Sequence, residues 1–226
     1  MQAGEGPPLV LLHGLAGSGA WWKRNLPALA GSFRVTAIDL PGFGASHRDA
    51  RLILDEVPAQ LAAFLGELGI ERAHVMGHSM GGLVAGGLAA DHPERVDRLV
   101  LVDAGFLSLD PTWRHRLTGP VLTLPWTSPS ILPTLLRDAL RSGPMRMARA
   151  TAELLRKDWG HKLPAITAPT LVVWGQHDRV CNPRIGEQIA AAVPDARLVI
   201  IRGAGHNPMW EKQPAFDREV LAFLHA

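Results

Sequence analysis

The sequence predicts an α/β protein with a doubly wound, mainly parallel β-sheet of about six strands. Six short apolar runs have the composition of strands that are buried on both faces, as the strands of parallel sheets are. Stretches with helical spacing separate several of these runs, and strands that alternate with helices favour a parallel sheet with right-handed crossovers. With 226 residues and a hydrophobic content of 47%, the chain can bury one sizeable core.

Apolar runs and helical stretches follow one another along most of the chain. The predicted strands are residues 9–12, 33–40, 73–76, 98–102, 170–174 and 197–201. Between the second and third strands, apolar residues recur every three or four positions, which predicts a helix with one apolar face. These residues are Leu54, Val57, Leu61, Leu65 and Leu68. Residues 80–91 and 213–225 also have the pattern of helices.

The alternation of strands and helices stops between residues 105 and 168. This stretch is rich in proline, and two groups of apolar residues within it have helical spacing, one of which is Leu132, Leu135, Leu136 and Leu140. We therefore expect residues 106–168 to form a helical lid, inserted into a core that consists of residues 1–105 and 169–226. We interpret the excess of Lys and Arg in the lid as solvated outer helix faces rather than as recognition of an anionic substrate.

Charge and cysteine content exclude several classes of protein. Lys and Arg number 23 against 21 Asp and Glu, which gives a net charge of +2, too balanced to indicate a nucleic-acid partner. The single cysteine, Cys181, excludes an intramolecular disulfide framework. No leader pattern is visible at the N-terminus, and no apolar run approaches the roughly 18 residues of a membrane span. We therefore expect a cytoplasmic protein that does not bind membranes.

The pentapeptide at residues 77–81, Gly-His-Ser-Met-Gly, has the form G-x-S-x-G. It lies directly after a predicted strand and directly before a predicted helix, which is the context that a nucleophile elbow requires. The glycines permit a turn too sharp for side chains, and this turn presents the Ser79 hydroxyl above the end of the sheet. The alternative, a tight glycine-rich turn with an incidental serine, is disfavoured by this context.

A serine hydroxyl needs a base that removes its proton, and in this arrangement the acid and the histidine follow the serine in that order. Asp178 follows the predicted strand 170–174, and His206 follows the predicted strand 197–201. Both therefore lie at carboxyl ends of strands, where sites form in open α/β sheets. We expect His206 to act as the base and Asp178 to orient it. Asp103, after the strand 98–102, is a weaker candidate for the acid.

Two backbone N–H groups are candidates for an oxyanion hole. The N–H of Met80 lies at the start of the helix that follows the nucleophile, and the N–H of Leu15 lies in the loop after the first strand. Only backbone groups act in this role, so both side chains are free to line the acyl pocket. The glycines of the first loop lack the spacing of a nucleotide-binding motif. We expect neither a cofactor nor a metal ion.

From Pro8 to Leu224 the sequence resembles the α/β-hydrolase superfamily, in its lid-bearing esterase, haloperoxidase-like and C–C hydrolase branch. The matching pieces are residues 13–18 with Trp22, residues 39–46, the elbow around Ser79, residues 175–178 and residues 205–208. The resemblance implies a triad of Ser79, Asp178 and His206, with Leu15 and Met80 at the oxyanion hole. It also implies a structural role for residues 39–46.

The sequence departs from the family in one respect, because it has no room for two strands that usually precede the one at residues 9–12. The strand at residues 33–40 is then expected at the edge of the sheet, with unpaired backbone groups. We expect the N-terminus or a second subunit to cover it, the latter through a homo-oligomer.

The leading functional interpretation is a serine hydrolase that cleaves a carboxylic ester of a small to medium, apolar substrate through an acyl-enzyme. The alternatives on the same triad are a C–C bond hydrolase, a lactonase or a cofactor-free perhydrolase, because fold and triad are shared among these chemistries. A remote alternative is a ligand receptor without turnover. The predicted pocket residues are Trp22 and His78 with Trp113 and Trp126 of the lid.

Overall fold

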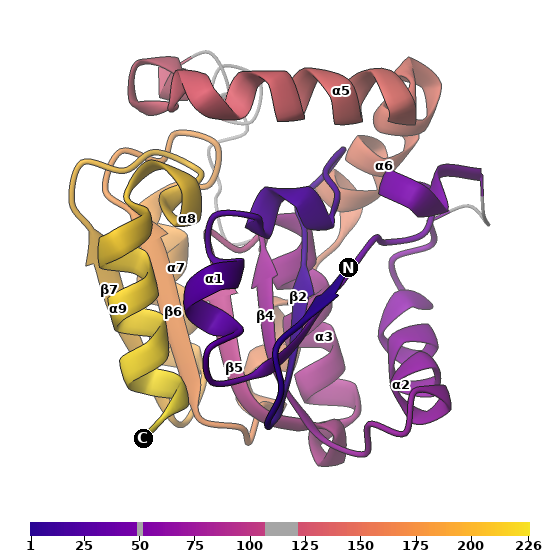
Figure 1. Ribbon diagram of the computed structural model, residues 1–226, viewed down its shortest axis with the longest axis vertical. Coiled ribbons are helices and arrows are strands. Elements are labelled where there is room, and N and C mark those ends of the chain that lie inside the picture. The colour runs from indigo at the N-terminus through magenta and orange to yellow at the C-terminus, as the bar shows by residue number, and fades with distance from the viewer. Residues whose placement is uncertain (49–51, 107–121) are drawn as a thin grey trace.

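A seven-stranded sheet forms the centre of the computed structural model, which describes residues 1–48, 52–106 and 122–226 (Figure 1). The strand order is β1-β3-β2-β4-β5-β6-β7, and every pair from β3 to β7 is parallel. The strands are β1 (Gln2–Ala3), β2 (Pro8–Leu12), β3 (Arg34–Ile38), β4 (Ala73–His78), β5 (Val96–Val102), β6 (Thr170–Gly175) and β7 (Ala196–Ile201). The predicted doubly wound α/β class is confirmed.

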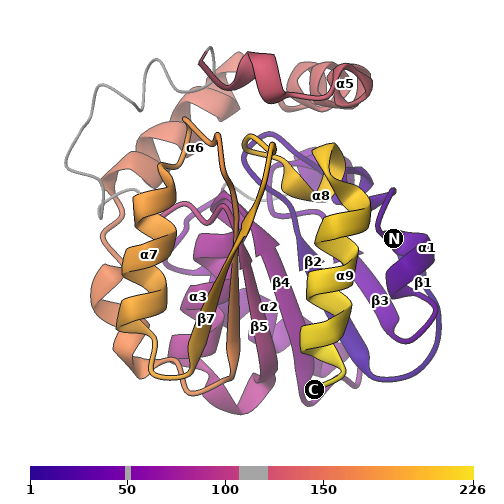
Figure 2. The ribbon, with the colours of Figure 1, turned by 90° about the vertical axis from the view of Figure 1, so that its left-hand side faces the viewer.

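Helices cover both faces of the sheet (Figures 1 and 2). Helices α2 (Val57–Glu67), α3 (Met80–Asp91) and α7 (Pro183–Ala192) pack on one face. Helices α1 (Leu26–Leu29), α8 (Pro208–Glu211) and α9 (Gln213–Leu224) pack on the other. Alternate residues of β2 enter the two cores, with Val10 and Leu12 on one side and Leu9 and Leu11 on the other. None of the helices among the described residues is long and apolar enough to span a membrane.

The N-terminus covers the edge of the sheet, which is one of the two arrangements expected from the sequence. Strand β1 pairs antiparallel with β3, with Gln2 opposite Thr36 and Ala3 opposite Val35. Two further hydrogen bonds of 2.9 Å join Met1 and Ala37: the Met1 amino group donates to Ala37 O, and Ala37 N–H donates to Met1 O. This short strand is the reason why the sheet has seven strands instead of about six. A second subunit at this edge stays a prediction.

The predicted lid contributes α5 (Leu132–Ser142) and α6 (Pro144–Arg156), which lie above the carboxyl ends of the strands (Figure 2). Residues 107–121 lie outside the described residues, so the lid boundaries stay a prediction. The helical spacing of the leucines from Leu132 to Leu140 predicted the helix that α5 forms, but most of these leucines are exposed. Leu132, Leu136 and Leu140 are 47, 63 and 74% accessible, because α5 buries its polar face, formed by Thr134, Asp138 and Ser142.

The end of β6 touches the loop that follows β7, and this contact predicts the effect of a glycine substitution. A Cβ atom on Gly175 would lie 1.7 Å from the carbonyl oxygen of Gly205. We therefore expect Gly175→Ala to lower the free energy of unfolding by about 1–3 kcal/mol, since the two loops must separate. Urea unfolding measures the difference. The control is Gly31→Ala, whose Cβ would lie no closer than 3.5 Å to its neighbours; equal losses in the two variants would contradict this interpretation.

Candidate active site

Ser79 occupies a strained turn between β4 and α3. Its φ is 52° and its ψ is −118°, a conformation that residues with a side chain rarely adopt. Neighbouring backbone leaves no room for side chains at the flanking glycines, because a Cβ on Gly77 would lie 2.2 Å from Gly81 O, and one on Gly81 would lie 2.5 Å from His13 O. The close packing explains the G-x-S-x-G pattern and fixes the Ser79 hydroxyl at the end of the sheet.

The structure brings together the three residues predicted as a triad. His206 Nε2 lies 3.1 Å from Ser79 Oγ, and His206 Nδ1 lies 2.7 Å from Asp178 Oδ2. The carboxylate can only accept, so Nδ1–H donates to it and Nε2 is left to accept the Ser79 proton. Asp178 Oδ1 also accepts hydrogen bonds from the N–H groups of Val180 and Cys181, at 2.7 and 3.0 Å, which fix the buried carboxylate.

Asp103, the weaker candidate for the acid, does not bond to His206. Its side chain is fully buried, and Oδ1 accepts a 2.9 Å hydrogen bond from the N–H of Gly175. Asp178 is therefore the carboxylate that contacts the histidine.

The loop after β2 passes directly against the nucleophile. A Cβ on Gly14 would lie 3.1 Å from Ser79 Cβ, and Leu15 lines the cavity at Ser79. Met80 begins α3, where the first N–H groups have no partner within the helix. These positions agree with an oxyanion hole made by the Leu15 and Met80 N–H groups, and that role stays a prediction.

Two polar side chains brace this loop. His13 Nε2 accepts from Leu40 N–H at 3.0 Å, so its Nδ1–H donates to Gly14 O at 2.7 Å. The carboxylate of Asp39 accepts from the N–H groups of Gly19 and Ala45, at 2.6 and 2.7 Å. Both contacts connect the loop after β2 to the chain after β3, and they explain the structural role implied for residues 39–46.

His78 lines the cavity, as predicted, and also links the elbow to the histidine loop. Its Nε2 donates a 2.7 Å hydrogen bond to the carbonyl oxygen of His206. Burial, followed by the nearby His206, holds the pKa of His78 well below its ordinary value, so the ring is neutral. The centroid of the His78 ring lies 5.6 Å from that of Trp21 and 4.9 Å from that of His206.

Of the predicted tryptophans, the two that the structure describes, Trp22 and Trp126, are not among the residues that line the cavity. Trp22 is fully buried, with its ring 6.5 Å from that of Phe216, and its neighbour Trp21 lines the cavity instead. The two residues are consecutive in a short 3₁₀ helix, Gly19–Trp22, and of the two only Trp21 lines the cavity. Trp126 stacks on His177 with a centroid distance of 4.6 Å. Trp113 lies outside the described residues.

Asp138 of α5 is a further residue at the site that sequence reasoning missed. It is 1% accessible, and its Oδ2 accepts from Ser18 Oγ at 2.7 Å and from Trp21 Nε1 at 3.2 Å. The carboxylate therefore attaches α5 to the loop after β2 and orients the tryptophan that lines the cavity. No local pattern predicts this contact, because the partners are more than 100 residues apart.

A cavity of about 470 Å³ opens at Ser79 and His206. Its described lining contains no Asp, Glu, Lys or Arg and is dominated by apolar side chains, among them Leu15, Trp21, Leu124, Leu132, Leu135, Leu154, Leu155 and Val180. Asn207 adds a polar group, since it is 6% accessible and its Oδ1 has no hydrogen-bond partner among the described residues. The cavity fits an uncharged organic group with few polar atoms.

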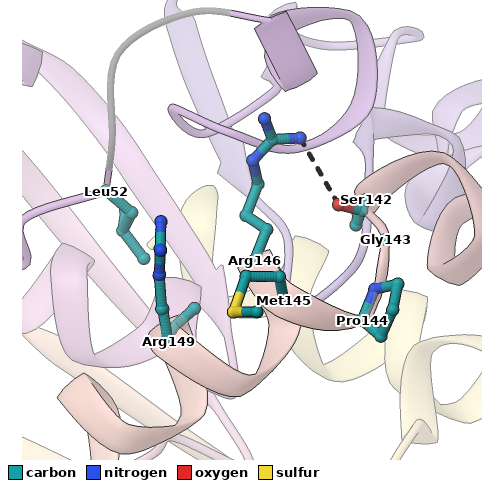
Figure 3. Close-up of a pocket in the computed structure, with 8 residues that line it drawn as sticks. Leu52, Ser142, Gly143, Pro144, Met145, Arg146 and Arg149 are labelled. Carbon is teal, nitrogen blue, oxygen red and sulfur yellow. Dashed lines mark hydrogen bonds between the residues drawn. The ribbon is translucent and has the colours of Figure 1, made fainter.

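A second cavity, of about 340 Å³, lies between Leu52 and the start of α6 (Figure 3). Arg146 and Arg149 extend from α6 in the same direction there, and Arg146 Nη1 lies 3.4 Å from Ser142 O. The two cavities share no lining residue. These two lid arginines are therefore separate from the cavity at Ser79.

In the part of the chain that the structure describes, one group of side chains has the arrangement of metal ligands. Asp178, Cys181 and His206 place ligand atoms within 4.8 Å of one another. Asp178 and His206 are already bonded to each other, however, so this arrangement follows from the contact between acid and base.

The chain matches known hydrolases along its length. Residues 7–140 and 147–213 match the family model for the alpha/beta hydrolase fold, so the chain belongs to this family and is a hydrolase. A 2-hydroxy-6-oxononadienedioate/2-hydroxy-6-oxononatrienedioate hydrolase from Pseudomonas sp is 31% identical over 254 residues, which cover 99% of this chain and 90% of that protein.

Proteins of known structure that share this fold have different activities. The enol-lactonase from Burkholderia xenovorans LB400 is 26% identical, with a TM-score of 0.80 and coverage of 100% of this chain and 95% of that one. A thermophilic esterase from Thermogutta terrifontis is also 26% identical, with a TM-score of 0.83 and coverage of 100 and 92%. The expected family is confirmed, and its members differ in the bond they hydrolyse.

The buried neutral histidines predict a loss of stability in acid. Burial is the main cause that lowers the pKa of both His13 and His78. In the unfolded chain a histidine has a pKa of about 6.5, so below that pH the unfolded state binds more protons than the folded state. We therefore expect these two histidines to add nothing to the pH dependence above about pH 6.5, and to lower the free energy of unfolding as the pH decreases below it.

Urea unfolding between about pH 5 and pH 7.5 measures this dependence. His78→Asn should flatten it, while His161→Asn, at an exposed position, serves as the control. The same slope in wild type and His78→Asn would contradict the assignment to His78.

Proposed function

We propose that the chain is a serine hydrolase that forms an acyl-enzyme on Ser79. The observation that supports this most directly is the hydrogen-bonded series from Asp178 through His206 to Ser79 Oγ, at 2.7 and 3.1 Å. His206 takes the Ser79 proton as Oγ attacks the substrate carbonyl carbon, and the oxyanion lies toward the Leu15 and Met80 N–H groups.

Collapse of the tetrahedral intermediate breaks the bond to the leaving group, which takes the proton from His206. A water molecule then gives a proton to His206 and attacks the acyl carbon, and the acid product leaves with Ser79 restored. Asp178 holds the histidine in the tautomer that this cycle needs and stabilises its cation.

We propose that the bond cleaved is a C–C bond beside a ketone. The relative from Pseudomonas sp supports this choice, because a 2-hydroxy-6-oxo acid has no ester and its hydrolysis breaks a C–C bond beside the oxo group. Cleavage of a C–C bond was an alternative in the sequence analysis, whose leading interpretation was the hydrolysis of a carboxylic ester.

The uncharged cavity favours a second candidate, the hydrolysis of a lactone or neutral ester. The described lining offers no Lys or Arg side chain that would pair with a substrate carboxylate, and the unpartnered Asn207 Oδ1 is an acceptor, which cannot pair with one either. The likeness to the enol-lactonase and to the thermophilic esterase agrees with this candidate.

A substrate panel tests the function. The panel contains 2-hydroxy-6-oxononadienedioate, its neutral diester, a medium-chain lactone and p-nitrophenyl butyrate. We expect wild-type turnover of at least one compound, and Ser79→Ala should lower kcat by about 10³-fold or more, because the nucleophile is lost. The ranking of the panel by kcat/KM decides between the C–C bond and the ester or lactone.

Ser32→Ala, at an exposed serine, is the matched control and should keep full activity. Labelling of Ser79 by a fluorophosphonate, located by mass spectrometry, tests the nucleophile without a substrate. Full activity in a folded Ser79→Ala variant would overturn the proposal, and failure of the probe to label wild-type Ser79 would favour a receptor without turnover.

A further inference from the structure

A second buried carboxyl group lies next to the proposed triad and has no role in it. Asp103 follows β5 with a φ of +42°, and its N–H donates to Val173 O at 3.0 Å. Its Oδ1 accepts from Gly175 N–H, but its Oδ2 is buried and receives no hydrogen bond from any described residue. A buried oxygen without a partner costs about 1–3 kcal/mol, so the arrangement needs an explanation.

The group that faces Asp103 is the carboxyl of Asp178. Both residues bond to Gly175, Asp103 through its side chain and Asp178 through its N–H, which donates to Gly175 O at 3.2 Å. Burial first, and then the charge of Asp178, raise the pKa of Asp103 well above its ordinary value. Two carboxyl groups in contact in a dry interior do not both ionise, so one keeps its proton.

The hydrogen bonds show which of the two keeps the proton. Asp178 receives the N–H groups of Val180 and Cys181 and the Nδ1–H of His206, all of which stabilise its ionised form. Asp103 receives a single N–H, from Gly175. A carboxylate has about four lone-pair sites, so Asp178 can accept one more donor.

We propose that Asp103 is a positioning residue of the triad, which remains protonated and donates a hydrogen bond from Oδ2 to the carboxylate of Asp178. The bond satisfies the unpaired oxygen and holds the acid in line with His206. It transfers no proton during the reaction, so Asp103 stays neutral throughout. The inference rests on the proposed function, because it assigns a role toward the same triad.

The protonated state of Asp103 also decides how much negative charge lies behind the carboxylate that contacts His206. An ionised Asp103 would place a second negative charge behind Asp178, and this charge would favour the cationic form of the base over the form that accepts the Ser79 proton. Glu211 is the other acid that faces this group. Burial raises the pKa of Glu211 as well, and its Oε2 accepts from Gly205 N–H at 2.6 Å.

The rate of Ser79 labelling by a fluorophosphonate, measured against pH, tests the proposal without a known substrate. Asn at position 103 is neutral and keeps a donor, so Asp103→Asn should leave the midpoint of the acid limb unchanged and the rate within about threefold of wild type. Asp103→Ala should slow labelling about tenfold or more, because the bond to charged Asp178 is lost. Asp195→Asn, at an exposed aspartate, is the control.

If Asp103 is ionised, Asp103→Asn removes a negative charge and lowers the midpoint by about one pH unit or more, which would overturn the proposal. Infrared spectra near neutral pH give a second measurement, independent of catalysis. Wild type minus Asp103→Asn should show the C=O band of a protonated carboxylic acid, and the difference with Asp195→Asn should not. Absence of the band overturns the proposal even where the alanine variant does not fold.

Failure of the proposed function can be distinguished from failure of the proposal for Asp103. A wild-type protein that fails to react with the fluorophosphonate contradicts the nucleophile, while the infrared difference still reports which carboxyl group carries the proton.

Discussion

The site depends on the left-handed backbone conformation of Ser79. In this turn the close-packed backbone leaves space for a single side chain, and the conformation places the Ser79 side chain there. Strand β4 ends, the chain turns within one residue, and α3 begins, while Gly77 and Gly81 lie against backbone that would clash with any Cβ. The strain is retained because the parallel sheet and α3 fix both ends of the turn. The nucleophile, one proposed oxyanion donor and the approach of the loop at Gly14 all follow from this geometry.

Around this turn burial shifts the pKa values of several ionisable groups toward their neutral forms. His13 and His78 act as hydrogen-bonding braces, and burial lowers the pKa of each. Asp178 is surrounded by donors, whereas Asp103 and Glu211 have pKa values that burial raises. The carboxylate of Asp178 bonds directly to His206, which is the arrangement a general base needs.

Local and regular features of this fold could be predicted from the sequence, and single contacts between distant segments could not. The elbow is local, and Asp178 and His206 follow strands whose carboxyl ends meet in any parallel sheet, so order along the chain was sufficient. The choice between Trp21 and Trp22 depends on the phase of one short turn. The orientation of α5 depends on the bond from Ser18 to Asp138, 120 residues away, which buries the polar face of the helix.

The contact between Gly175 and Gly205 has a consequence for how this protein can change. Because a carbonyl oxygen fills the space of a side chain at position 175, the loop of Asp178 and the loop of His206 form one unit. An insertion or a larger residue in either loop displaces the other, so the catalytic distances cannot be adjusted one at a time. Apart from the buried Asp138, which bonds to Ser18 and Trp21, the exposed positions of helices α5 and α6 carry no such constraint. Laboratory evolution toward new substrates should therefore diversify these exposed positions and leave both loops intact.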